Sequence, residues 1–192
     1  MYNKKILIIL FSFLFVTNTY ALIEVDITRG NLNPLPIAVS PLSIDNDSRI
    51  KFEKILKKKD LGSEISIIVE NNLKTSGLFN PLDKNAFLQA PDIANLKPRF
   101  EDWNLIKAQA LITGKVNLLD NKLRVEFRLW DVLAGKEMMA LAFTTVPTNW
   151  RRVGHIITDK VYERLTGEKG YFDTRIIYVA EEGPKIKRIK KL

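Results

Sequence analysis

Residues 110–146 decide the fold, and they read ALITGKVNLLDNKLRVEFRLWDVLAGKEMMALAFTTV. The runs 110–119, 123–132 and 138–146 are typical of strands, and only three to five residues separate one run from the next. Connections this short join antiparallel neighbours. In the middle run the odd-numbered residues from Leu123 to Leu129 are apolar, while the even-numbered residues from Arg124 to Trp130 are expected on the solvent face. The stretch therefore predicts a three-stranded meander.

Two amphipathic helices flank this meander in the sequence. The first follows the N-cap candidates Asp60 and Ser63, and Gly77 ends it; its apolar residues are Leu61, Ile65, Ile68, Val69 and Leu73. The second opens at Pro147 and ends at Gly167; its apolar residues are Trp150, Val153, Ile157, Val161 and Leu165.

The other segments complete one domain over residues 35–170. Residues 35–42 predict a short strand whose two prolines fit either a sheet edge or the ends of the strand. Residues 78–97 are expected to form loop, and residues 100–103 to lead into a short helical turn. The fold class is therefore α+β, a two-layer α/β arrangement with a mixed, mostly antiparallel sheet and two amphipathic helices.

The first 21 residues are typical of a signal peptide. Lys4 and Lys5 precede an apolar run of eleven residues, Ile6 to Val16, interrupted only by Ser12, which fits a secretory h-region and is too short to span a bilayer. Thr19 and Ala21 are small residues at the −3 and −1 positions of a cleavage site after Ala21. We expect an exported chain that begins at Leu22 and has no transmembrane segment after signal removal.

Residues 22–34 form a strand followed by a linker in this interpretation. Ile23, Val25 and Ile27 alternate with Glu24, Asp26 and Thr28, and turn residues follow from Arg29 onward. A terminal strand of this kind either pairs with its own domain or adds to the sheet edge or groove of a partner.

The sequence offers no recognisable catalytic or metal site. It has no cysteine and one histidine, His155, which we expect to be a satisfied helix residue. Asp131, Asp159, Glu163 and Asp173 have no spacing that forces two carboxylates into one site, and Asp159 with Glu163 is expected to form a solvated helix face. No catalytic residues, metal or cofactors are predicted.

The net charge of +8 does not indicate nucleic-acid binding. Seven of the 30 lysines and arginines lie in the first five and last nine residues, which leaves 23 basic against 22 acidic residues elsewhere. A nucleic-acid binder usually spreads basic residues over a folded face.

Four stretches resemble the TolB family, the periplasmic component of the Tol-Pal system of Gram-negative bacteria. They are LPIAVSPL at 35–42, SGLFNP at 76–81, RLWDV at 128–132 and, above all, WRRVGHIITDKVYERLTGEKGYF at 150–172. The stretches occur in the family's order, and the resemblance covers essentially the whole chain.

The resemblance implies a non-catalytic adaptor that links the inner-membrane protein TolA to the peptidoglycan-associated lipoprotein Pal. The family's amino-terminal α/β domain precedes a six-bladed β-propeller that binds Pal, and the system maintains outer-membrane integrity and draws the outer membrane inward during cell division. In the family the mature amino terminus contacts TolA and changes between docked and free states. Carried over by position, the TolA-contacting residues here are Leu22, Ile23, Glu24, Val25, Asp26, Ile27, Thr28, Arg29 and Gly30.

Residues 171–192 resemble the beginning of the first propeller blade, with a strand expected at 174–180. A blade takes roughly 40 residues or more, so the expectation is an incomplete blade in a fragment or a truncated gene product, with Pal binding in doubt. The alternative to the adaptor is a small periplasmic hydrolase with an unrecognised site.

Overall fold

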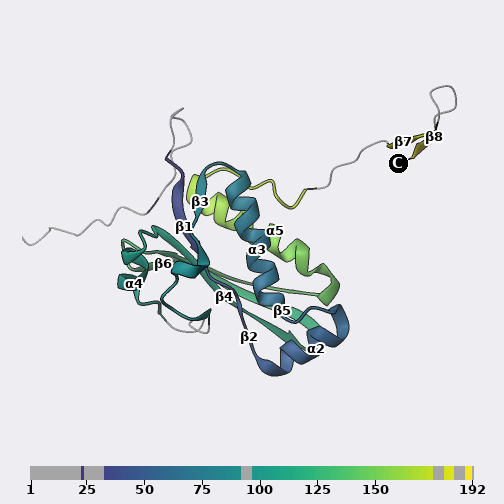
Figure 1. Ribbon diagram of the computed structural model, residues 1–192, viewed down its shortest axis with the longest axis horizontal. Helices are drawn as coiled ribbons and strands as arrows, with labels where there is room; N and C mark the ends of the chain where they lie inside the picture. The colour runs from purple at the N-terminus through teal and green to yellow at the C-terminus, as the bar shows by residue number, and fades with distance from the viewer. Residues whose placement is uncertain (1–22, 24–32, 92–96, 175–179, 184–188, 192) are drawn as a thin grey trace, which may run out of the picture.

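The computed structural model describes residues 23, 33–91, 97–174, 180–183 and 189–191 (Figure 1). The predicted meander forms β4 (Ala110–Leu119), β5 (Lys122–Asp131) and β6 (Lys136–Thr145), each antiparallel to the next. Leu119 pairs with Lys122, so Asp120 and Asn121 form a two-residue turn, and both have positive φ, 49° and 58°. Two successive left-handed residues are what a tight hairpin requires, and Asp and Asn tolerate that conformation.

The other half of the sheet is parallel. β1 (Leu35–Val39) lies between β4 and the short β3 (Phe79–Pro81) and is parallel to both, while β2 (Ser43–Ile44) pairs with β4 farther along. The strand order is β3-β1-β4-β5-β6. The sheet is therefore mixed, and its long pairings are antiparallel, as predicted.

Two predictions for this half need correction. Residues 78–97 were expected to be loop throughout, yet 79–81 form β3, and the 3₁₀ helix η2 (Lys84–Ala86) follows. Because β3 pairs with β1, β1 is an interior strand and the sheet-edge interpretation of its prolines is wrong. Pro36 fits near the strand's beginning because pairing with β4 starts only at Ile37, so no ladder N–H is lost there.

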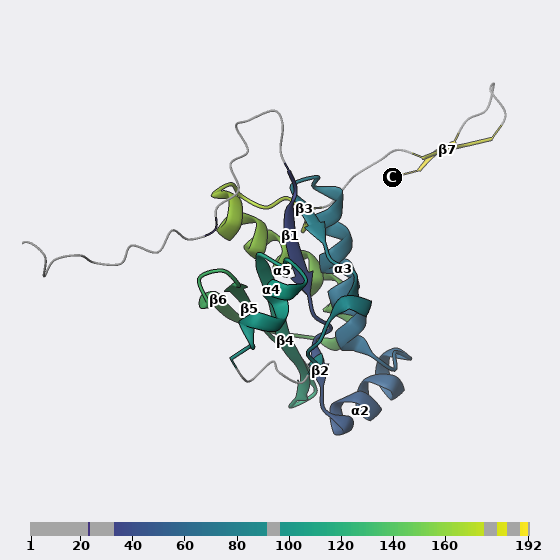
Figure 2. The same ribbon diagram turned by 60° about the vertical axis from the view of Figure 1, so that its left-hand side comes forward.

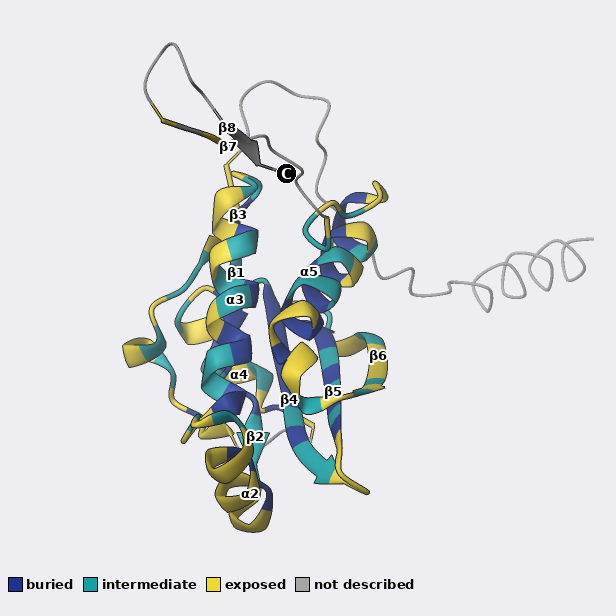
Figure 3. Cartoon of the chain, turned by 90° about the vertical axis from the view of Figure 1, so that its right-hand side faces the viewer, coloured by how far each residue is buried: buried dark blue, intermediate teal, exposed yellow. Residues whose placement is uncertain are grey.

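Three helices lie on one face of the sheet: α2 (Asn46–Leu56), α3 (Leu61–Thr75) and α5 (Trp150–Thr166), the last preceded by η4 (Pro147–Asn149) (Figure 3). Asp60 caps α3, since its carboxylate accepts the Ser63 N–H at 3.1 Å, and Gly167 with φ 76° ends α5. Both helices were predicted. Helix α2 was not predicted, and Asp45 caps it by accepting the Ser48 N–H at 2.8 Å, a bond that helps to hold the pKa of Asp45 below its usual value.

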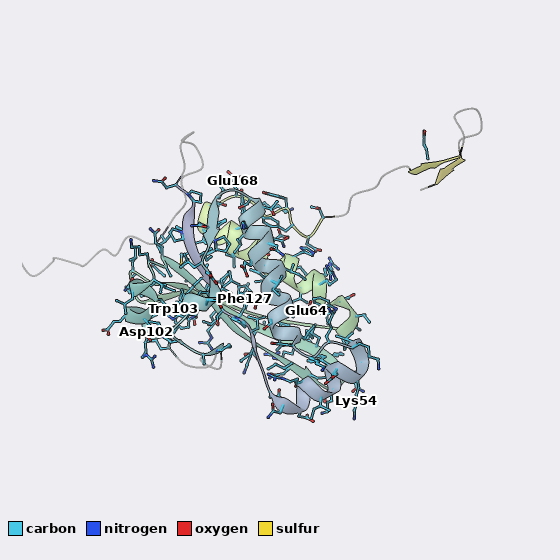
Figure 4. All side chains as sticks on the ribbon, in the orientation of Figure 1. Lys54, Glu64, Asp102, Trp103, Phe127 and Glu168 are labelled. Carbon is cyan, nitrogen blue, oxygen red and sulfur yellow. The ribbon has the colours of Figure 1, made fainter. Side chains whose placement is uncertain are left out.

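The main core lies between these helices and the sheet. Phe127, fully buried, is near its centre (Figure 4). The buried members from the two predicted helices include Ile65, Val69, Leu73, Ile157, Val161 and Leu165. The spacing that predicted these helices therefore also identified the residues that they bury.

A second, smaller core lies on the opposite face of the sheet under α4 (Phe100–Leu105) (Figure 2). Trp103 of α4 is 1% exposed and packs with Trp130, Leu111 and Val132. Trp130 was expected on a wet face, and that expectation is wrong: it is 5% exposed, and its indole N–H donates to Thr113 Oγ1 at 2.9 Å. Helix α4 thus covers one end of a face that is polar elsewhere.

Near the carboxyl terminus, β7 (Ala180–Glu182) and β8 (Ile189–Lys191) pair as an antiparallel hairpin. Most of the strand expected at 174–180 lies outside the described residues.

Candidate interaction site at one end of the sheet

The two described ends of the domain meet at one end of the sheet. Leu35, which begins β1, pairs with Phe79, whose ring contacts the Tyr162 ring with centroids 6.2 Å apart. Tyr162 in turn contacts Tyr171 at 5.6 Å and Phe172 at 5.8 Å, both edge to face. The chain therefore enters β1 and leaves α5 at the same end of the domain, as Figure 2 also shows for β1, β3 and α5.

The amino-terminal segment is attached at this end through Ile23. Its backbone N–H donates to Asp131 Oδ2 at 3.2 Å, and its half-buried side chain packs against the main core. The other residues of the predicted TolA-contacting segment lie outside the described residues: Leu22, Glu24, Val25, Asp26, Ile27, Thr28, Arg29 and Gly30.

Asp131 was not identified as an interaction residue from the sequence. It ends β5, pairs with Ala110 across the sheet and is fully buried. Its Oδ1 accepts the Ala134 N–H at 2.8 Å, so both carboxylate oxygens accept a backbone N–H. Nothing in the local sequence signals this role, because the second donor, Ile23, is 108 residues away.

The segment that follows α5 is fixed to that helix. Asp159 accepts the Phe172 N–H on Oδ1 at 2.7 Å and the Asp173 N–H on Oδ2 at 3.1 Å. Arg152 donates to both oxygens of Asp173 at 3.0–3.1 Å, and this contact raises the pKa of the Arg152 guanidinium. At Gly170 a Cβ would lie 2.4 Å from Asp159 Cα, so a side chain does not fit there. We call these contacts of residues 170–173 the exit clamp.

The contacts of the exit clamp contradict one prediction made for the carboxylates from the sequence and agree with another. Asp159 does not form a solvated face with Glu163, because it turns to the backbone of 172–173 while Glu163 pairs with Lys160 at 2.8 Å. Asp159 and Asp173 nevertheless have structural contacts, as expected. Burial, followed by the effects of Tyr171 and Glu168, raises the pKa of the Tyr162 hydroxyl, which belongs to the same cluster.

The described residues contain no cluster for metal binding, and His155 has a hydrogen-bond partner. No group of three or more His, Cys, Asp or Glu residues among them could hold a metal ion. His155 Nδ1 lies 2.9 Å from Asn72 Nδ2, which also donates to Thr158 Oγ1 at 3.1 Å, so the histidine is a satisfied residue between α3 and α5, as predicted. None of the helices in the described part of the chain has the length and apolar character that a membrane span requires.

These elements define a two-layer α+β domain in which β1 begins and α5 ends at the same end of the sheet. The family model for the TolB amino-terminal domain matches residues 23–138. The chain is 87% identical over 173 residues to the Tol-Pal system protein TolB of Pelagibacter ubique (strain HTCC1062), a match that covers 90% of this chain and 39% of that protein. The crystal structure of TolB from Acinetobacter baumannii superposes with a TM-score of 0.61 at 26% identity, over 76% of this chain and 32% of the other.

The chain therefore belongs to the TolB family and is related to components of the Tol-Pal system. It spans about 39% of the length of the curated relative.

Proposed function

We propose that this chain is a non-catalytic periplasmic adaptor module of the Tol-Pal system and that residues Leu22–Gly30 bind TolA. Pal binding is expected of the propeller in full-length relatives, and we assign it to no residue here. The comparisons do not favour the hydrolase alternative.

The observation that supports the proposal is the attachment of Ile23. One backbone hydrogen bond and one half-buried side chain connect the described part of this segment to the domain. A strand with alternating apolar residues can exchange its own domain for the sheet edge of a partner. Backbone pairing would supply the affinity, and the apolar side with Val25 and Ile27 would supply the specificity.

The test is to replace Val25 and Ile27 together by Asp in the full mature chain. Two carboxylates on the apolar side would have to be desolvated on binding, so we expect the affinity for the periplasmic part of TolA to fall at least 100-fold. Titration calorimetry measures the affinity, and thermal unfolding checks that the domain still melts cooperatively.

The control changes two residues on the other side of the same strand, Glu24→Asp and Thr28→Asp, and adds one carboxylate there. These changes keep the apolar side, and we expect TolA affinity to change less than threefold. An unchanged affinity in the Val25→Asp, Ile27→Asp variant would show that the segment is not the TolA contact. Loss of cooperative melting in that variant would show that the segment is an integral strand of the domain.

A further inference from the structure

The two edges of the described sheet differ in their ability to pair with another chain. At one edge β3 has only three residues and ends in Pro81. At the other edge β6 has ten residues, and Figure 3 shows it at the margin of the sheet. Short strands, prolines and charged residues prevent pairing at an edge. From Met139 to Thr145, β6 has no proline and no charge, and it pairs regularly with β5, so this edge can accept a further strand.

The helix-facing side of β6 has an apolar row that the helices cover only in part. Leu141 pairs with Phe127 and Phe143 with Val125, and both partners belong to the main core. The Phe143 and Phe127 rings are stacked with centroids 6.0 Å apart. Leu141 is nevertheless 37% exposed, and Phe143 is half-buried. Apolar side chains on an added strand would therefore remove further apolar surface from water here.

The other side of β6 has only small side chains along the same stretch. They are exposed, and they are Ala140, Ala142 and Thr144. Across the sheet these residues pair with Arg128, Glu126 and Arg124 of β5, in that order. A strand added beside β6 would have its Cα atoms about 10 Å from those of β5, which is two interstrand spacings. Because the intervening side chains are small, long side chains of β5 can reach those of the added strand over β6.

The charges next to β6 on this side are positive in sum. Lys115 and Arg124 pair with Glu126 at 3.4 and 2.9 Å. Arg128 pairs with Glu137 at 3.1 Å. Each guanidinium uses one nitrogen in these contacts and is 38% or 41% exposed, whereas an arginine has five N–H donors. Arg124 and Arg128 can therefore each bind a further carboxylate, while Glu126 between them would repel one.

We propose that β6 binds an extended segment of a partner protein by strand addition, and that this segment has the pattern acidic, apolar, neutral, apolar, acidic. Its acidic residues lie opposite Ala140 and Thr144, beside the two arginines, and its neutral residue lies opposite Ala142. Its apolar residues lie opposite Leu141 and Phe143. Backbone hydrogen bonds supply the affinity, and the two carboxylates supply the specificity. The pattern is the same in both directions, so it fits a parallel or an antiparallel strand.

This site is independent of the proposed TolA contact. There a segment of this chain is the added strand, whereas at β6 the domain itself accepts a strand. Absence of TolA binding would refute the proposed function and would leave the β6 site untouched.

The first experiment titrates the full mature chain with the capped peptide Thr-Glu-Val-Thr-Val-Glu-Thr. The matched peptide has Lys in place of both Glu residues. We expect amide NMR shifts centred on β6, and a dissociation constant at least about tenfold lower for the Glu peptide, since its two carboxylates meet the arginines of β5. Equal dissociation constants, or shifts centred on another element, would overturn the proposal.

Charge reversal on β5 tests the specificity. In the double variant Arg124→Glu, Arg128→Glu the Lys peptide should bind more tightly than the Glu peptide. The control Lys51→Glu, Lys54→Glu makes the same change of net charge on exposed residues of α2 and should keep the native preference. If the first variant does not melt cooperatively, Arg124→Gln, Arg128→Gln replaces it, and the two peptides should then bind within about threefold of each other. A native preference that persists in either variant would show that the arginines do not read the peptide.

Backbone methylation tests the pairing itself. Successive N–H groups of a strand point to opposite sides, so the two Val and the two Glu of the peptide point their N–H groups in opposite directions. N-methylation of one of these pairs should weaken binding by about tenfold or more, and methylation of the other should have little effect. Equal effects would contradict strand addition. Dimers of the peptide-free chain that Leu141→Lys abolishes would show that β6 binds a second copy instead, and the proposal would be wrong.

Discussion

The two ends of this domain are attached to the same end of the sheet in different ways. Of the amino-terminal segment the structure describes Ile23, whose N–H donates to Asp131 and whose side chain packs against the main core. The exit clamp has two backbone hydrogen bonds to Asp159, a two-pronged Arg152–Asp173 contact, aromatic packing around Tyr162 and a glycine that fits against α5. The exit clamp fixes one end of the domain, whereas the proposed function requires the amino-terminal end to detach.

This difference suits an adaptor. A segment that leaves the domain to bind a partner must be released at a small cost in free energy. A connection toward a following domain must instead keep a fixed direction if the two domains are to act together. Because Tyr162 contacts Phe79, which pairs with Leu35, the fixed end lies beside the place where the detachable segment joins the sheet. A change in the contacts of the exit clamp can therefore reach the start of β1 through Tyr162 and Phe79.

The largest effect is expected from Gly170→Ala. The added methyl group would lie 2.4 Å from Asp159 Cα, so residues 170–173 must move away from α5 and lose their acceptor. We expect the free energy of unfolding to fall by about 1–3 kcal/mol, as for other overpacked sites. Urea unfolding of the full chain measures it, with the exposed Glu168→Ala as control.

Limited proteolysis shows whether the clamp itself has opened. Trypsin should cut the native chain after Arg175 and leave Lys169 intact, because the clamp holds the residues between them. In Gly170→Ala the product should end at Lys169. Cleavage at Lys169 in the native chain would show that the exit clamp does not hold residues 170–173.

The elements with strong periodicity could be predicted from the sequence, and the short ones could not. The meander and the helices α3 and α5 have long, regular patterns, and the structure confirms them. Helix α2 was missed because it buries only Ser48 and Phe52, while its apolar residues Ile50 and Ile55 are exposed. Strand β3 was missed because three residues that end in Pro81 carry too little pattern to distinguish a strand from loop.

The contacts of Ile23 and of the exit clamp could not be predicted from the sequence, for a different reason. Asp131 and Asp159 are single carboxylates whose partners are backbone N–H groups, 108 residues away in one case and 13–14 residues away in the other. Any residue can donate a backbone N–H, so no residue type marks the partner in the sequence. Trp130 was placed on the correct face, but its burial depends on α4, which spacing within β5 does not report.

An intermediate effect is expected from Asp159→Asn. Asparagine can accept one of the two N–H groups of 172–173, but its amide nitrogen faces the other donor. One partly buried donor is left unsatisfied, and we expect a loss of about 1–2 kcal/mol in the free energy of unfolding. The control Glu163→Gln, four residues on in the same helix, removes an exposed pair with Lys160 and should not move the urea midpoint. Equal effects of the two variants on the urea midpoint would show that the Asp159 bonds of the exit clamp stabilise the domain no more than an exposed ion pair does.

The smallest effect is expected from Arg152→Ala. The Arg152 side chain is 59% exposed, and contacts between charged groups at such positions contribute little because water and salt screen them. We expect the urea midpoint to stay within error of the native value and the tryptic product still to end at Arg175, because the Asp159 bonds to the backbone remain. If Arg152→Ala instead opens the clamp as Gly170→Ala does, the exit depends on one exposed ion pair. The contrast between a fixed end and a detachable end would then no longer hold.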